Sequence, residues 1–196
     1  NCTSSFGVIT NYNPSSTTNV LMNVENCNFI NNVATYAPGA INNCGILNVL
    51  NSNFVSNSAR YWAGAIHTHC NAYTRILNSE FKGNTAGWNG GALYSYSKLE
   101  VYNSTFTDNN CTTNNGGGAI GAFNYISTYN VTVENNVFDS TTRGVGTHKY
   151  SQNSKGENIY HQNITIRNNE FKNIHDNGVF VLNWKNTKIE NNKFTN

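Results

Sequence analysis

Aromatic and imidazole side chains recur at matching positions along this chain, and their chemistry suits contact with a ligand. The candidate contact residues are Tyr36, Tyr61, Trp62, His67, His69, Trp88, Tyr94 and Tyr96, and the series extends to Phe123 and Tyr125. Flat rings held about 5 Å apart on neighbouring strands can lay their faces against successive sugar rings, while nearby Asn amides bond the hydroxyls. We therefore predict that these residues bind a glycan or the surface of a partner. The alternative is that the rings only cover corners of the fold.

The segment His67-Thr68-His69 places two imidazoles on one side of a strand, directly before Cys70. Two such side chains can contribute to a metal site. No second cluster of ligand residues stands at a recognisable spacing. We therefore expect hydrogen-bonding histidines, no bound metal and no cofactor.

Paired carboxylates are the other chemistry to consider, because glycoside hydrolysis needs two of them across the scissile bond. The chain has three Asp residues, at Asp108, Asp139 and Asp176, and they stand at different distances from the repeated Phe described below. The loop 143–162 is a candidate binding loop that contains Arg143, His148 and Lys149. Sparse acids on an Asn-lined surface are poor material for proton transfer, so we expect no enzyme activity. A polysaccharide lyase or hydrolase is the alternative class.

A four-residue motif, Asn-(Ser/Asn/Cys)-x-Phe, sets the spacing of these side chains. It recurs seven times, at 26–29, 51–54, 78–81, 103–106, 135–138, 168–171 and 191–194. A motif that returns at such a period indicates one supersecondary unit stacked on copies of itself. An apolar β-branched residue stands two positions before each motif Asn, and the approach alternates as a strand does.

Short strands at this period can each pair with their own copy one turn later if the chain winds into a coil. The sequence therefore predicts an all-β, right-handed, single-stranded parallel β-helix of about seven coils. We expect the Phe residues to stack inside the coil. We expect each motif Asn to occupy a left-handed corner and to bond the equivalent amides of the neighbouring coils.

The repeats are regular in the first part of the chain and longer in the second. Residues 26–120 form repeats of 25–27 residues, whereas 121–196 form longer, irregular coils with an inserted loop at 143–162. We interpret 1–196 as a single β-helix domain excised from a longer protein and monomeric within that larger chain.

Phe-x-x-Asn pairs accompany the motif at Phe29/Asn32, Phe54/Asn57, Phe81/Asn84 and Phe106/Asn109. Each pair precedes a Gly-Gly-Ala-Ile-like element, complete at 90–93 and 117–120. This pattern resembles the repeats of polymorphic outer membrane proteins and of adhesin-like β-helix surface proteins of bacteria and archaea. The resemblance covers residues 26–120, whereas 121–196 depart from it. It implies an extracellular, cell-surface location and adhesion to a glycan or protein of a host or neighbouring cell, and it transfers no catalytic residues.

The composition argues against several partners. The net charge is +2 and 11% of residues are charged, so the chain carries no electrostatic footprint for nucleic acid or an anionic membrane. No apolar run approaches the roughly 18–20 residues that span a bilayer. We expect no nucleic-acid binding and no membrane insertion by this segment.

One further row is predicted to face outward, immediately before each motif Asn. Its members are Glu25, Leu50, Leu77, Tyr102, Glu134, Arg167 and Glu190. The last three read as a solvated charge ladder, whereas the apolar members mark either a docking surface or a covered one.

Five cysteines and five glycosylation sequons leave the compartment open. Cys44 and Cys70 stand at similar places on adjacent coils and are the pair to test for a disulfide, but buried free thiols are the alternative. The sequons begin at Asn1, Asn103, Asn110, Asn130 and Asn163, and they support a surface location only weakly in so Asn-rich a chain. The function that we expect is noncatalytic, adhesin-like attachment at the cell surface, with an enzyme or a purely structural spacer as alternatives.

Overall fold

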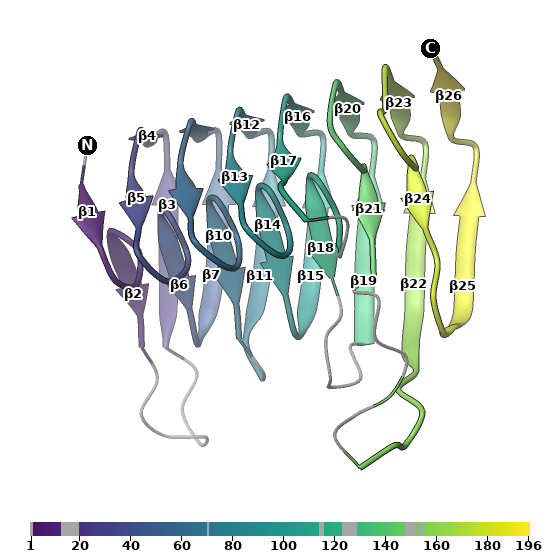
Figure 1. Cartoon of the computed structure of the whole chain (residues 1–196), viewed down its shortest axis with the longest axis horizontal. Helices are drawn as coiled ribbons and strands as arrows, with labels where there is room; N and C mark the ends of the chain where they lie inside the picture. The colour runs from purple at the N-terminus through teal and green to yellow at the C-terminus, as the bar shows by residue number, and fades with distance from the viewer. Residues whose placement is uncertain are drawn as a thin grey trace.

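The chain winds into four parallel β-sheets that run along one rod, with the two termini at opposite ends (Figure 1). The computed structural model describes residues 2–12, 20–69, 71–113, 116–122, 129–147, 152 and 155–196, with the backbone alone at 129. Each coil contributes at most one short strand to each sheet, so neighbouring strands in a sheet come from successive coils.

Sheets A and B contain the shortest strands. Sheet A consists of β1 (Thr3–Ser4), β5 (Val33–Ala34), β9 (Ser58–Ala59), β13 (Thr85–Ala86) and β17 (Asn110–Cys111). Sheet B consists of β2 (Ile9–Asn11), β6 (Ile41–Asn43), β10 (Ile66–Thr68), β14 (Leu93–Ser95), β18 (Ile120–Ala122), β21 (Val145–Gly146) and β24 (Val179–Phe180).

Sheets C and D flank the corner at which the repeated motif begins. Sheet C consists of β3 (Leu21–Glu25), β7 (Ile46–Leu50), β11 (Tyr73–Leu77), β15 (Lys98–Tyr102), β19 (Tyr129–Glu134), β22 (His161–Arg167) and β25 (Trp184–Glu190). Sheet D consists of β4 (Asn28–Ile30), β8 (Asn53–Val55), β12 (Glu80–Lys82), β16 (Thr105–Thr107), β20 (Val137–Asp139), β23 (Glu170–Lys172) and β26 (Lys193–Thr195).

The prediction of a parallel β-helix is confirmed. Sheets B, C and D each contain seven strands, which are separated by six steps from one coil to the next. The seven repeats of the sequence therefore correspond to seven strands and about six complete turns. Within the described ranges the chain has no helix, and so none with the length and apolar character needed to cross a membrane.

The motif Phe residues form one continuous column inside the coil, as predicted. The register of sheet D aligns each Phe with the next, from Phe29 to Phe194. Centroids of successive rings lie 4.7–5.0 Å apart, with interplanar angles of 2–12°. This distance matches the spacing of hydrogen-bonded strands, so the rings stack because their backbones do.

Two columns of left-handed backbone turn the chain at its corners. All seven motif Asn residues have φ between 49° and 56°, as predicted. A second column, two residues after each Phe, is not identified in the sequence analysis. It consists of Asn31, Ser56, Gly83, Asp108, Ser140 and Asn173, with φ of 48–62°. No single residue type is common to all of these positions, so no sequence motif marks this corner.

Amide ladders run along the rod, but not at the predicted position. In the first coils the ladder joins the Asn that lies three residues after Phe: Asn32 Nδ2 donates to Asn57 Oδ1 at 2.8 Å, and the pattern continues through Asn84 to Asn109. In the last coils it joins Asn136, Asn169 and Asn192. The motif Asn side chains are exposed, and within the described residues no hydrogen bond joins one to another. The prediction is wrong because the left-handed corner turns these amides toward solvent.

Candidate binding surface

Five aromatic side chains form a continuous surface on the outside of four successive coils. We call Phe6, Tyr36, Tyr61, Trp62 and Trp88 the aromatic ridge. Neighbouring ring centroids lie 4.7–5.9 Å apart. Phe6, Tyr36 and Trp88 are 51%, 40% and 46% exposed. The ridge contains four of the eight predicted contact residues, and Phe6 is an addition that no repeated motif marks.

The residues of the ridge lie on the loops that lead from sheet A to sheet B. Successive loops are hydrogen-bonded to one another. The Tyr61 N–H donates to the Tyr36 carbonyl at 3.1 Å, and the Trp88 N–H donates to the Tyr61 carbonyl at 2.7 Å. Trp62 also packs against a small buried cluster that includes Ala34 and Ala59. The rings are thus held at the coil spacing by the backbone and are anchored below by Trp62.

These loops approach one another so closely that one position per coil accepts only glycine. A Cβ on Gly39 would lie 2.0 Å from the carbonyl oxygen of Gly64, and a Cβ on Gly64 would lie 2.1 Å from that of Gly91. Any side chain there would force the coils apart. The Gly of each Gly-Ala-(Ile/Leu) triplet is therefore set by contact between coils.

Ring pairs between Tyr36 and Trp88 on successive coils meet edge to face, whereas Phe6–Tyr36 and Tyr61–Trp62 are tilted by 52° and 42°. The angle between ring planes is 67° for Tyr36 and Tyr61, 65° for Tyr61 and Trp88, and 75° for Trp62 and Trp88. Aromatic pairs favour this arrangement because the positive edge of one ring meets the negative face of the other. A ligand would therefore meet an apolar surface of alternating ring faces and edges.

The other four predicted residues join the same cluster beside the ridge. His67 on β10 lies 6.3 Å from Trp62 by ring centroids and stacks on Tyr94 of β14 at 5.4 Å. His69 and Tyr96 follow these strands and contact His67 at 4.2 and 5.1 Å. All eight predicted residues therefore lie together.

His67 and Tyr94 are nevertheless buried, with exposed fractions of 4% and 1%. The loop that carries Trp88 approaches Tyr94 closely, since a Cβ on Gly90 would lie 2.9 Å from the Tyr94 Cβ. These two rings are therefore not exposed as an outward-facing aromatic row would require, and their contact with a ligand stays a prediction. Strand alternation predicts which way a side chain points, but it does not predict a loop that covers it.

The two histidines are neutral at physiological pH. Burial lowers the pKa of His67 well below 6.5, and the neighbouring His69 lowers it further. Burial also lowers the pKa of His69, whose Nε2 lies 2.8 Å from the Asn42 Oδ1. Nowhere in the described part of the chain do three or more His, Cys, Asp or Glu side chains gather as metal ligands. Cys70 lies outside the described residues.

The three Asp residues are dispersed, and two of them make structural contacts. Asp139 Oδ1 accepts hydrogen bonds from Asn173 at 2.9 Å and from Ser140 at 3.0 Å, and chiefly the Asn173 bond lowers its pKa. Asp108 occupies an exposed left-handed corner. Asp176 pairs with the guanidinium of Arg143, which lies 4.4 Å from the centre of the Phe180 ring.

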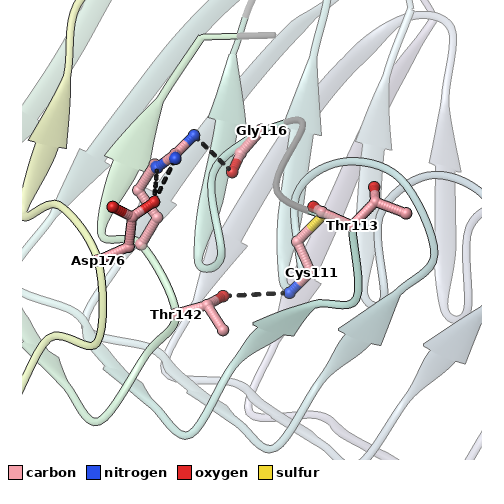
Figure 2. A network of polar contacts seen from close by, with 6 residues as sticks. Cys111, Thr113, Gly116, Thr142 and Asp176 are labelled. Carbon is pink, nitrogen blue, oxygen red and sulfur yellow. Dashed lines mark hydrogen bonds and ion pairs between the residues drawn. The ribbon is translucent and has the colours of Figure 1, made fainter. Parts of the chain in front are cut away.

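Arg143 contacts Asp176 and Gly116, which Figure 2 labels together with Cys111 and Thr142 of the same polar region. Its Nε lies 3.1 Å from Asp176 Oδ2, and its Nη1 lies 3.5 Å from the Gly116 carbonyl oxygen. Beside it, the Cys111 N–H donates to Thr142 Oγ1 at 3.3 Å. The arginine of the predicted binding loop is thus turned inward. His148 and Lys149 lie outside the described residues, as do Phe123 and Tyr125.

The outward row of sheet C is aligned as predicted. The register runs from Glu25 through Leu50, Leu77, Tyr102, Glu134 and Arg167 to Glu190. Arg167 Nη2 lies 2.9 Å from Glu134 Oε2, which confirms the charge ladder. Leu50, Leu77 and Tyr102 are half-buried in the sheet face, so they expose less apolar surface than the ridge.

No disulfide joins the described cysteines, which are Cys2, Cys27, Cys44 and Cys111. The predicted partner of Cys44 is Cys70, which lies outside the described residues. A separate cavity of about 280 Å³ lies at the C-terminal end of the stack and is lined by Phe171, Ile174, Asp176, Gly178, Phe194, Thr195 and Asn196. It is bounded by the last coil and lies at the opposite end of the chain from the ridge.

Comparisons of the chain with protein-family models, with curated proteins and with solved structures found no match. The aromatic ridge is therefore the feature of this molecule that bears most directly on function.

Proposed function

We propose that this chain is a noncatalytic, cell-surface segment that mediates attachment by binding glycans on its aromatic ridge. The observation that carries the proposal is the continuity of the ridge, in which exposed rings from four coils lie within 5.9 Å of their neighbours. Contiguous exposed apolar surface of this kind marks interaction sites on soluble proteins.

Sugar rings suit such a surface because they have apolar C–H faces and polar rims. The C–H faces pack against aromatic rings, and hydroxyl groups bond polar side chains and backbone groups at the edges of the site. The rigid loops keep the rings in place before the ligand arrives, which lowers the entropic cost of binding.

The resemblance of the repeats to polymorphic outer membrane proteins and adhesin-like surface proteins supports the extracellular location and the role in adhesion. A glycan of a host or neighbouring cell is the partner that we propose. The contacts of Asp139 and Asp176 support the noncatalytic reading, because carboxylates engaged with Asn173 and Arg143 are poor proton donors.

The test is binding of the purified chain to a glycan array, with Trp88→Ala as the main variant. Trp88 is exposed, so its removal disturbs the fold less than removal of the anchoring Trp62. We expect Trp88→Ala to weaken binding by at least about tenfold, as for a central aromatic in an interface. Tyr12→Ala is the matched control, because Tyr12 is an exposed ring outside the ridge.

Each other outcome points to a different class of function. Equal binding by wild type and Trp88→Ala would exclude the ridge as the site. Binding to cells without binding to any glycan would favour a protein partner, and binding to neither would favour a structural spacer. Time-dependent cleavage of a polysaccharide that Asp139→Asn abolishes would favour an enzyme.

A further inference from the structure

Arg60 is the one Lys, Arg, Asp or Glu residue on the segments that form the ridge. These segments are 2–12, 33–41, 58–67 and 85–90. Arg60 stands directly before Tyr61, its side chain is exposed, and its guanidinium carbon lies 5.1 Å from the centre of the Tyr61 ring. A positive charge is thus held at the edge of the apolar surface, where a cation over an aromatic face is favourable.

Arg60 differs from the other arginines of the chain in having no carboxylate beside it. Arg75 pairs with Glu100, Arg143 with Asp176, and Arg167 with Glu134. Within the described ranges, Arg60 forms no ion pair and its side chain forms no hydrogen bond. The only acidic residue between Glu25 and Glu100 is Glu80, which lies on β12 in sheet D.

An unpaired guanidinium next to exposed rings matches a sugar that carries a carboxylate. The planar fork of Arg bonds both oxygens of a carboxylate, and such charge-assisted bonds are about twice as strong as neutral ones. The absence of acidic side chains from the ridge segments also removes the repulsion that an anionic ligand would otherwise meet.

We infer that the ridge binds acidic saccharides of the uronate or sialate type, with sugar rings on the aromatic side chains and a carboxylate on Arg60. This inference rests on the proposed glycan-binding function. It adds a charge preference, which the aromatic rings alone do not supply.

The experiment uses an array on which uronate- and sialate-containing oligosaccharides are each printed beside their methyl esters. The ester keeps the sugar and removes the charge. We expect wild type to prefer the acid over its ester by about twofold to fivefold, the range for an exposed charge pair, and to lose the preference in high salt. Arg60→Gln should bind acid and ester equally while still binding the ester, and calorimetric titration of the best pair should give the same ratios.

Lys82→Gln is the matched control, because it removes one exposed positive charge from sheet D without altering the ridge segments. It should retain the preference of wild type. Equal binding of acids and esters by wild type would overturn the inference and leave the glycan-binding ridge standing. Failure of wild type to bind any printed saccharide would instead overturn the proposed function, and the inference with it. A preference that persists in Arg60→Gln would also overturn the role of Arg60.

Discussion

The two halves of the rod place their ladder of Asn amides at different ends of the Phe strand. In the coils up to residue 120, the buried amide ladder follows the Phe strand, from Asn32 to Asn109. From residue 136 onward it precedes the Phe strand, from Asn136 to Asn192. Each coil therefore needs a buried amide that bonds the backbone at a turn, but the fold accepts this amide at either end of the sheet D strand.

The change of ladder takes place between two neighbouring coils. In the first half, serines occupy the position directly after the motif Asn, which Asn136 takes in the second half. There the Ser79 N–H donates to Ser104 Oγ at 3.1 Å. The next step joins Ser104 N–H to Asn136 Oδ1 at 2.9 Å. On the other side, the column of Asn109 continues with Thr141, which is buried and whose Oγ1 has no hydrogen-bond partner among the described residues. Sheet A ends at β17, in the same coil as Asn109.

The column of Phe rings should contribute equally to the stability of both halves. Loss of one of its rings should cause the largest loss of stability that we expect. Phe81 and Phe138 are each fully buried between two stacked rings. Phe81→Ala and Phe138→Ala should each lower the free energy of unfolding by about 3–5 kcal/mol, measured by urea denaturation. Phe194→Ala, at the exposed end of the column, is the control and should cost much less. A cost for Phe138→Ala below half that of Phe81→Ala would show that the halves differ in their core as well.

Loss of a ladder amide should be the next largest effect. Asn84 accepts hydrogen bonds from the Asn57 N–H and Nδ2, both at 3.0 Å, and donates to the Phe54 carbonyl at 2.8 Å. Asn84→Ala leaves these buried groups without partners and should destabilise the fold by about 3 kcal/mol. Asn169→Ala should cost a similar amount, whereas Ser79→Ala should cost only about 1 kcal/mol. An equal loss for Asn84→Ala and Ser79→Ala would contradict the special role of the amide.

Acid should destabilise both halves through buried histidines. Burial lowers the pKa of His161, in the second half, from 6.5 to about 4, and it also lowers that of His67 in the first. The unfolded chain therefore binds more protons, and stability falls as the pH drops below 6.5 toward 4. His161 should account for up to about 3 kcal/mol of this loss.

Denaturation of wild type and His161→Gln at several pH values separates this contribution. The variant should show a flatter dependence of stability on pH between 6.5 and 4. The same slope in both proteins would mean that His161 does not control acid stability. The slope that remains in the variant comes from the other groups with lowered pKa values, which include His67 and His69 in the first half.

Extension of the first ladder into the second half should produce the smallest effect, and a favourable one. Thr141→Asn supplies an acceptor for Asn109 and a donor for the carbonyl one coil earlier, so it should raise the free energy of unfolding by about 1 kcal/mol. Thr141→Val, which only removes the unpaired hydroxyl, is the control and should give a smaller gain. If Thr141→Asn is less stable than Thr141→Val, the two halves differ in backbone geometry at this corner as well as in side chains.

The sequence predicts those features that the same residue type repeats in every coil. The column from Phe29 to Phe194, the left-handed motif Asn corner and the register of sheet C all follow from the recurring motif. The second corner, at Asn31, Ser56 and Gly83, escapes prediction because several residue types tolerate or favour a left-handed backbone at an exposed turn. The position of the amide ladder is predicted wrongly because the Asn that recurs in all seven motifs is exposed. The Asn that forms the ladder changes its position relative to Phe along the rod.

The sequence predicts that the residues of the candidate site lie together, but it does not predict which of them are exposed to solvent. Coil stacking brings all eight predicted rings together, since they recur at matching places. Tyr94 is buried beside a loop of the same cluster, and the pairing of Arg143 with Asp176 joins residues one long coil apart. Neither contact has a repeated signature. The unpaired state of Arg60 likewise emerges only when the partners of the other arginines are known.

The aligned left-handed corners have a consequence for how such a molecule can evolve. Each regular coil meets the same backbone above and below it, so duplication or deletion of one repeat creates no new kind of contact. Recombination between similar gene segments would therefore lengthen or shorten the rod in whole steps of about 4.8 Å while every row stays aligned. The length of the rod can therefore change during evolution without a change in the side chains on its surface.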